Sequence, residues 1–254
     1  REIQRRMATI HIDVDPAEIG KNMQAAIPLV GNVKVILRQI LDRGAPVTNS
    51  AAWLEQLPDY RRAELNRRFP HREGYVFPGT VLRKLGARLD DDAVVCVDVG
   101  QNQIFTCKYL PQKNGRLLTS GGLGTMGYAL PAAVGGKVAR PDRQTVVVCG
   151  DGSFQMSMME LATIQQYHIP VKIVVLRNNY LGMVREYQHY SYKDRYSVVD
   201  IAGTPHLDKL AEAYDIPFIR VSRNEEIDGA LDAFLKDDCS YLMECMIDPM
   251  DLVK

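Results

Sequence analysis

Short apolar runs alternate with segments of helical periodicity along most of the chain, and this alternation most constrains the fold. The runs occupy residues 93–99, 145–149, 171–176, 217–221 and 241–247, and the first three are rich in β-branched residues. Segments with helical periodicity lie between them, at residues 122–139, 156–167, 207–214 and 225–235. Because wholly apolar strands joined through helices form parallel sheets covered on both faces, we predict an α/β fold of this kind for residues 77–254.

The first 76 residues follow a different pattern. Residues 8–14 alternate like a strand that ends at Asp15-Pro16, and residues 33–41 have helical periodicity. We therefore predict that residues 1–41 are the partial end of a central α/β domain and that residues 42–76 form a connector. The connector contains a basic stretch at residues 61–72, diluted by Glu64, which favours a solvated linker helix over a nucleic-acid patch.

The charge balance and the cysteine content narrow the class of protein. The 254 residues carry 31 Lys and Arg against 31 Asp and Glu, which gives no reason to expect nucleic acid or an anionic membrane as a partner. The chain has no run of apolar residues long enough for a transmembrane helix, and its first residues lack the apolar centre of a signal peptide. Five cysteines without CxxC spacing predict reduced thiols in a cytoplasmic protein.

Two polar positions follow neighbouring strands of the predicted sheet. Asp151 comes directly after the strand at 145–149 between two glycines, and Asn178 comes after the strand at 171–176. A right-handed crossover can make these strands neighbours, and open α/β sheets bind ligands at the carboxyl ends of their strands. A carboxylate and an amide oxygen side by side suit Mg²⁺, which takes six oxygens and often shares them with phosphates. The carbonyl of Tyr180 is the candidate third ligand, and Ser153 with nearby N–H groups at a helix start can hold a phosphate.

The sequence around these positions resembles that of a known group of enzymes. Residues 150–153 (GDGS) with Asn178-Asn179 resemble the metal-binding signature of thiamine-diphosphate enzymes. Residues 120–128 (SGGLGTMGY), 130–133 (LPAA) and 182–184 (GMV) are similar to the acetolactate synthase family, also called acetohydroxyacid synthase. Residues 10–22 resemble the end of that family's central domain. The resemblance covers the C-terminal portion of a family member and implies the thiamine-diphosphate-binding fold for residues 77–254.

The resemblance implies a role for individual residues. Asp151, Asn178 and the Tyr180 carbonyl would hold Mg²⁺, and Met126, Met183 and Tyr187 would line the substrate pocket. The family often has tryptophan where this chain has Tyr187, which leaves open the preference for 2-ketobutyrate or pyruvate. The residues implied to contact thiamine diphosphate are Gln101, Asn102, Gly124, Met126, Gly150, Gly152, Ser153, Gly182 and Met183.

The activity implied is a Mg²⁺-dependent condensation in branched-chain amino acid biosynthesis. In the family, pyruvate is decarboxylated on the cofactor and joined to a second 2-keto acid, giving acetolactate or acetohydroxybutyrate. The glutamate that activates the cofactor comes from a separate pyrimidine-binding domain, so we assign no catalytic residue within this chain. We therefore expect a fragment of a longer enzyme that is inactive alone. The resemblance also implies a homo-oligomer, a dimer or tetramer in the intact enzyme, and leaves room for a regulatory subunit.

Other functions remain open from the sequence. Residues 122–127 (GLGTMG) also satisfy the G-x-G-x-x-G fingerprint of dinucleotide-binding proteins, so a NAD-dependent oxidoreductase is one alternative. The residues before this stretch form at most a short, partly apolar strand, and the fingerprint leaves Asn178 unexplained. A second alternative is a remnant that binds cofactor without activity of its own. Glyoxylate carboligase, sulfoacetaldehyde acetyltransferase and oxalyl-CoA decarboxylase share the metal loop.

Overall fold

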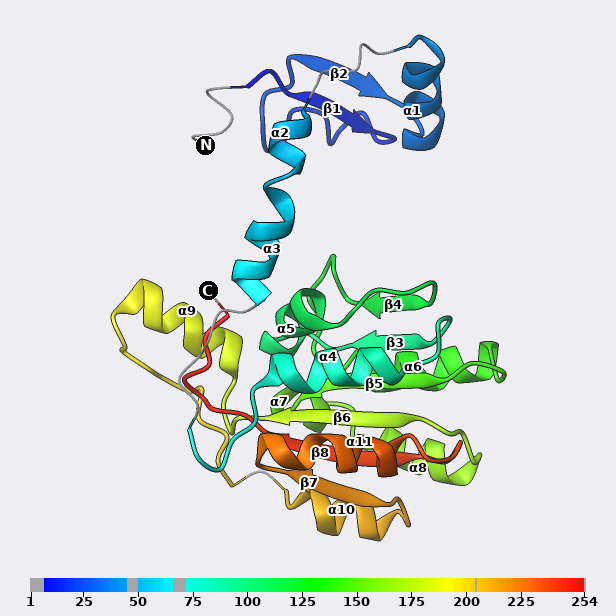
Figure 1. Cartoon of the computed structure of the whole chain (residues 1–254), viewed down its shortest axis with the longest axis vertical. Helices are drawn as coiled ribbons and strands as arrows, with labels where there is room; N and C mark the ends of the chain where they lie inside the picture. Colours follow the sequence, from blue (N-terminus) through cyan, green and yellow to red (C-terminus); the bar gives the residue numbers. More distant parts are fainter. Residues whose placement is uncertain (1–6, 45–49, 66–71, 204, 254) are drawn as a thin grey trace. The chain divides into compact units, whose positions relative to one another are not determined.

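The computed structural model describes residues 7–44, 50–65, 72–203 and 205–253. The chain divides into two compact units, Arg1–Asn66 and Arg67–Lys254. Both units are drawn in Figure 1.

The smaller unit contains a short two-stranded parallel sheet. β1 (Ile10–Asp13) pairs with β2 (Ile27–Val30), and helices α1 (Val33–Asp42), α2 (Ala51–Leu54) and α3 (Leu57–Leu65) follow. Asn32 caps α1, because its side chain accepts a hydrogen bond from the Lys34 N–H at 3.0 Å. The sequence predicted β1 and α1 but missed β2, a four-residue strand that contains a proline.

The larger unit is built on a six-stranded sheet in which every pair of neighbours is parallel. Its strand order is β4-β3-β5-β6-β8-β7. The strands are β3 (Val94–Val97), β4 (Arg116–Thr119), β5 (Thr145–Gly150), β6 (Lys172–Arg177), β7 (Phe218–Val221) and β8 (Tyr241–Met246). The parallel α/β sheet predicted from the sequence is therefore confirmed.

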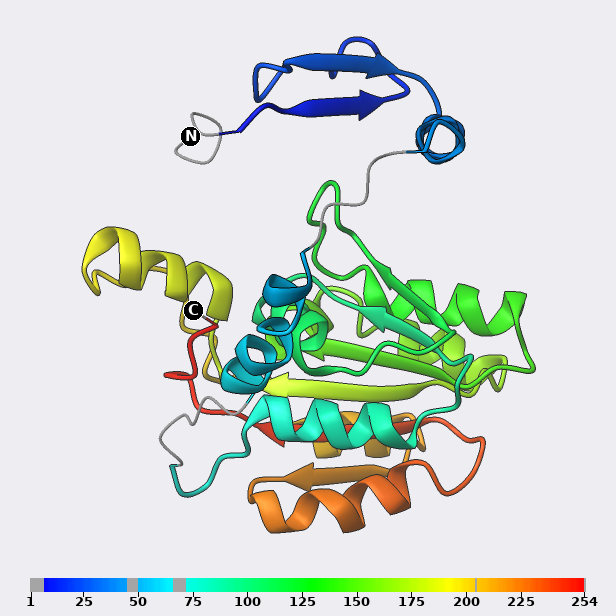
Figure 2. The same ribbon diagram turned by 45° about the horizontal axis from the view of Figure 1, so that its top comes forward.

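Helices cover both faces of this sheet (Figures 1 and 2). One face carries α4 (Pro78–Arg88), α5 (Gln101–Tyr109) and α11 (Ile227–Phe234), the last preceded by a 3₁₀ turn, η2 (Asn224–Glu226). The other carries α6 (Ala129–Ala139), α8 (Glu160–Gln166) and α10 (Leu207–Ala213). Two further helices, α7 (Asp151–Gln155) and α9 (Gly182–Tyr192), begin just beyond the carboxyl ends of β5 and β6.

The central strands are apolar throughout because both of their faces are buried. On the α6–α8–α10 face, Val147, Cys149 and Ile173 pack in one core with Leu161 and Ile164 of α8. The alternate strand residues point to the opposite face, as the two-residue period of a strand requires.

The path of the chain through the sheet creates a switch point. From β3 the chain passes through α5 to β4 on one side, and then through α6 on the opposite face to β5 on the other side of β3. The connections that leave β3 and β5 therefore diverge to opposite faces. Open α/β sheets bind ligands in the crevice that such a divergence leaves at the carboxyl ends of the strands.

Several elements differ from the sequence-based expectations. The helix predicted at 122–139 begins only at Ala129, and the one predicted at 156–167 begins only at Glu160. Helices α4, α5 and α9 were not predicted. Strand β4 lies at the edge of the sheet and starts with an exposed arginine, so it lacks the continuous apolar character of its neighbours.

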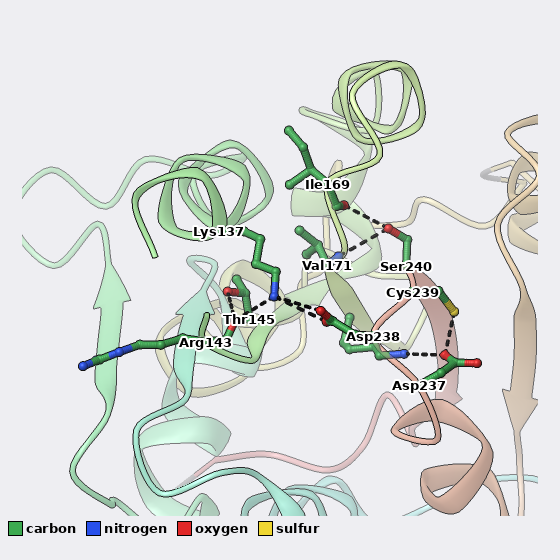
Figure 3. Close-up of polar contacts among 10 residues, drawn as sticks. Lys137, Arg143, Thr145, Ile169, Val171, Asp237, Asp238, Cys239 and Ser240 are labelled. Carbon is green, nitrogen blue, oxygen red and sulfur yellow. Dashed lines mark hydrogen bonds and ion pairs between the residues drawn. The ribbon is translucent and has the colours of Figure 1, made fainter. Parts of the chain in front are cut away.

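At the amino edge of the sheet, two buried lysines fix the loop between α11 and β8 (Figure 3). The Lys137 Nζ lies 3.3 Å from a carboxylate oxygen of Asp238, and the Lys172 Nζ lies 3.5 Å from one of Asp237. The Ser240 hydroxyl donates to the Ile169 carbonyl at 3.1 Å. Polar contacts therefore hold this loop against the starts of β5 and β6.

The cysteines lie mostly within the sheet. All five are free, and Cys96, Cys149 and Cys245 are buried in strands. Among the helices that the structure describes, none is long and apolar enough to span a bilayer.

The buried face of α8 gives a test of the core. We expect Leu161→Ala to lower the free energy of unfolding by about 2–5 kcal/mol, because Leu161 is fully buried and its removal leaves a cavity. The matched change Leu123→Ala should have an effect within about 0.5 kcal/mol, because Leu123 is 94% exposed. Urea denaturation of both variants measures the difference, and equal effects would contradict the assigned core.

Candidate cofactor and metal site

A cavity of about 160 Å³ opens at the carboxyl ends of β3, β5 and β6. Its walls come from the turns after these strands and from the loop before α6. Apolar side chains, including Leu176, Leu181 and Ile247, form part of the lining. The sequence-predicted residues that line it are Gln101, Asn102, Gly124, Met126, Gly150, Asp151, Gly152, Ser153, Asn178, Tyr180, Gly182 and Met183.

The Asp151 carboxylate is buried and held by backbone N–H groups. Its Oδ2 accepts from the Asn179 N–H at 2.7 Å, and its Oδ1 accepts from the Gly152 N–H at 3.1 Å. Burial raises the pKa of Asp151 to about 6, although these N–H donors oppose the rise. Within the described residues, no lysine or arginine forms an ion pair with this carboxylate. A cation in the cavity would compensate the buried charge.

Asn178 lies beside the same cavity at the end of β6. Its Oδ1 accepts from the Tyr180 N–H at 2.9 Å, and its Nδ2 donates to Gln101 Oε1 at 3.2 Å. The side chain is buried, so its amide is held in one orientation by partners on both sides. The structure therefore brings Asp151, Asn178 and Tyr180 to one wall of one cavity.

The backbone between Asn178 and Tyr180 has an unusual conformation. Asn179 has φ 62°, in the left-handed region that asparagine tolerates better than most residues. Its side chain accepts from Arg177 Nε at 2.8 Å, and Arg177 in turn pairs with the fully buried Glu244 at 2.7 Å. This arrangement turns the Asn179 N–H toward Asp151.

Two glycines are required by close approaches at the cavity. A Cβ on Gly182 would lie 2.1 Å from Gln101 Oε1 and 2.7 Å from Asn178 Nδ2. A Cβ on Gly152 would lie 2.7 Å from Leu181 Cδ2 and 3.7 Å from the Met126 methyl carbon. Gly182 therefore leaves room for Gln101 and Asn178 to meet, and Gly152 leaves room for the apolar side chains beside it.

Asn102 and Ser153 line the cavity, and their side chains also form hydrogen bonds with the surrounding backbone. The Asn102 Nδ2 donates to the Asp98 carbonyl at 2.6 Å, and its Oδ1 lies near Gly150. The Ser153 hydroxyl exchanges hydrogen bonds with the backbone N–H and carbonyl of Gly150, at 3.1 and 3.2 Å. The hydroxyl that was predicted to donate to a phosphate therefore closes the turn at the start of α7.

Asp98 organises the glycine-rich loop, and sequence reasoning missed it. Its Oδ1 accepts from the N–H groups of Val99 and Gly127, and its Oδ2 accepts from the Ala129 N–H, at 2.8–2.9 Å. This buried carboxylate fixes the point where the loop carrying Met126 meets α6. An acid directly after the strand at 94–97 was the available signal.

Tyr187 is the predicted site residue that the structure does not bring to the cavity. It lies on α9, is 60% exposed and is absent from the cavity lining. Its ring packs edge-on against Tyr192, with the centroids 5.8 Å apart. Met183, one turn earlier on the same helix, does line the cavity.

The donor set fits a hard cation that also binds phosphate. Asp151, Asn178 and Tyr180 line the cavity and would offer one carboxylate, one amide oxygen and one backbone carbonyl, which leaves positions for phosphate oxygens and water. Helices α5 and α9 both begin at the cavity, and their N-terminal N–H groups favour an anion there. The described residues contain no cluster of three or more His, Cys, Asp or Glu side chains suited to a metal. Such a cation would therefore need oxygen ligands in addition to the Asp151 carboxylate.

The parallel sheet with a cavity at its switch point agrees with the match of this chain to a known family. Residues 98–245 match the family model "Thiamine pyrophosphate enzyme, C-terminal TPP binding domain", and the chain belongs to this family. The matched segment begins at Asp98, directly after β3, and includes the ends of β5 and β6. Thiamine pyrophosphate, the same compound as thiamine diphosphate, is therefore the cofactor of this class.

Individual relatives narrow the resemblance to one kind of enzyme. The chain is 36% identical over 257 residues to the probable acetolactate synthase large subunit of Methanococcus aeolicus, covering 94% of this chain and 43% of that protein. It is 36% identical over 247 residues to acetolactate synthase isozyme 2 large subunit of Escherichia coli, covering 97% and 44%. It is 41% identical over 225 residues to acetolactate synthase of Arthrospira platensis, covering 85% and 38%. The chain thus spans less than half the length of these relatives.

These similarities do not favour the dinucleotide alternative. Residues 122–127, which satisfy its fingerprint, lie in an exposed loop that follows the edge strand β4. The helix that follows begins only at Ala129. A dinucleotide-binding function also gives no role to the hydrogen bond between Asn179 and Asp151.

The close approach at Gly182 gives a test of the site. We expect Gly182→Ala to weaken binding of thiamine diphosphate with Mg²⁺ by about tenfold or more, because the new Cβ would push apart Gln101 and Asn178. Gly229→Ala is the matched control, since a Cβ there has no neighbour within 4 Å. The control lies in an exposed stretch of α11 and should gain up to about 1 kcal/mol of stability. Calorimetric titration that gives equal affinities for both variants would contradict the geometry.

Proposed function

We propose that this chain supplies the diphosphate- and metal-binding half of an acetolactate-synthase-type enzyme. The reaction is the thiamine-diphosphate- and Mg²⁺-dependent condensation of pyruvate with a second 2-keto acid in branched-chain amino acid biosynthesis. The observation that carries this proposal is the placement of Asp151 and Asn178 on one wall of a cavity at the switch point. The similarity to acetolactate synthase large subunits supports the choice of reaction.

Asp151, Asn178 and the Tyr180 carbonyl are the proposed Mg²⁺ ligands. Hydrogen bonds from backbone N–H groups hold the Asp151 carboxylate and the Asn178 amide oxygen. The cation would bridge these oxygens to the diphosphate and lower the cost of burying the Asp151 charge. The remaining phosphate oxygens would face the N-termini of α5 and α9.

The reactive end of the cofactor would lie against apolar side chains. Met126 and Met183 line the cavity together with Leu181 and Val184. Thioether side chains adapt to irregular apolar surfaces, so they suit contact with the cofactor rings and with a small 2-keto acid. The bound cofactor supplies the electron sink for decarboxylation, while these side chains orient it and limit access of water.

The proposed contact between Tyr187 and the second substrate requires that another part of the intact enzyme packs over α9. Its exposure leaves it free to contact another part of the protein or a partner chain. Neighbouring apolar side chains on the same helix, including Val184 and Tyr190, are also exposed. This pattern supports assembly into a homo-oligomer, and we propose the cytoplasm as its location.

Deleting the metal ligand tests the cofactor proposal. We expect thiamine diphosphate to bind the chain in a Mg²⁺-dependent manner, and Asp151→Ala to weaken this binding at least about 100-fold. Asp142→Ala is the matched control, because Asp142 is exposed and pairs with Arg140 at the surface, outside the cavity lining. Isothermal titration with and without Mg²⁺ measures the affinities. Equal affinity of wild type and Asp151→Ala would refute the ligand assignment.

The source of the activating glutamate gives a second test. The residues lining the cavity include no glutamate, so we expect the purified chain to form no acetolactate from pyruvate, cofactor and Mg²⁺. Adding an isolated pyrimidine-binding domain of an acetolactate synthase should restore carboligation. Steady acetolactate formation by the chain alone would contradict this division of roles. Cofactor binding without any restored activity would instead favour a non-catalytic remnant.

A further inference from the structure

Glu186 is a buried carboxylate directly behind the cavity wall. It lies on α9 with 9% of its surface exposed, and its Oε2 accepts from Gln101 Nε2 at 2.8 Å and from the Val253 N–H at 3.1 Å. Among the described residues, no lysine, arginine or histidine pairs with it. A buried charge without a counter-ion costs stability, whereas a glutamine of the same size would avoid that cost.

Glutamate and glutamine differ at this position in which hydrogen bonds they can donate and accept. An ionised carboxylate only accepts hydrogen bonds, whereas an amide presents an acceptor on one side and donors on the other. Glu186 therefore requires the NH₂ group of Gln101 to face it. The Asp251 carbonyl, 3.5 Å from the same Gln101 nitrogen, favours the same orientation.

The orientation of Gln101 in turn fixes the orientation of Asn178. With its nitrogen toward Glu186, Gln101 presents Oε1 to Asn178, and the Asn178 Nδ2 donates to it at 3.2 Å. The Asn178 Oδ1 then lies on the opposite side, where the Tyr180 N–H uses one lone pair at 2.9 Å. The second lone pair is left for the cavity.

We propose that Glu186 is a positioning residue that makes Asn178 present oxygen, and not nitrogen, to the cation site. Mg²⁺ is bound through oxygen, so a reversed amide would place N–H donors against the cation. The assignment of the cation rests on the proposed function, whereas the amide orientations are a property of the chain alone. An experiment can therefore refute the cation assignment without refuting the amide orientations, and the reverse.

Glu186→Gln tests the proposal with almost no change in shape. The new amide can either accept from Gln101 or donate to it, so only the long contact to the Asp251 carbonyl still orients Gln101, and only the Tyr180 N–H still orients Asn178. We expect Mn²⁺ binding in the presence of thiamine diphosphate, followed by electron paramagnetic resonance, to weaken about 10- to 100-fold. Glu160→Gln is the matched control, because that glutamate lies on α8, outside the cavity lining, and accepts from the Thr163 hydroxyl at 2.9 Å.

A readout without metal or cofactor follows the amide groups themselves. In cofactor-free wild type, the side-chain NH₂ resonances of Gln101 and Asn178 should each appear as one protected set in ¹⁵N NMR spectra. In Glu186→Gln they should broaden or split, while Glu160→Gln should leave them unchanged. The signals are assigned by their loss in Gln101→Ala and Asn178→Ala.

The outcomes separate this inference from the cofactor assignment. Unchanged amide signals, or unchanged Mn²⁺ affinity, in Glu186→Gln would overturn the positioning role. If wild type bound no Mn²⁺ with thiamine diphosphate, the proposed function would fail, and the amide signals would still decide whether Glu186 sets the two orientations.

Discussion

The hydrogen bond from the Asn179 N–H to the Asp151 carboxylate joins the ends of two neighbouring strands, and the site depends on it. It forms because β5 and β6 are parallel neighbours, so their carboxyl ends meet at one edge of the sheet. The left-handed conformation of Asn179, supported by Arg177, turns the N–H toward the carboxylate. Without this contact, Asp151 would be buried with one backbone donor fewer, and Asn178 would lose its fixed distance from it.

Three of the buried carboxylates, Asp98, Asp151 and Glu186, lie in the cavity lining or hold residues that form it, and each is stabilised in a different way. Asp98 accepts only backbone N–H groups and fixes the glycine-rich loop. Asp151 also accepts backbone N–H groups, but burial keeps its pKa raised to about 6, which suits a group that gains a cation on binding. Glu186 accepts from one side chain and one backbone N–H, and it determines the direction of the neighbouring amides. Burying each carboxylate costs folding free energy, and its hydrogen bonds fix the position of groups proposed to bind the cofactor.

The sequence predicts the fold and the strand-end residues because both follow from local patterns. Apolar runs identify the central strands, and Asp151 and Asn178 follow two of them directly. Helix α5 was missed because Gln101 and Asn102 are polar yet buried, which removes the apolar stripe that marks a helix. The role of Glu186 depends on hydrogen bonds to residues 85 and 67 positions away, and no local pattern shows such contacts. The exposure of Tyr187 likewise depends on how α9 packs.

Anomalous diffraction from crystals grown with thiamine diphosphate and Mn²⁺ in place of Mg²⁺ tests the central claim most directly. A single anomalous peak within about 2.5 Å of an Asp151 carboxylate oxygen and the Asn178 amide oxygen, with diphosphate density beside it, is the predicted result. Bound cofactor with no peak between these residues, or a peak coordinated elsewhere, would contradict the account.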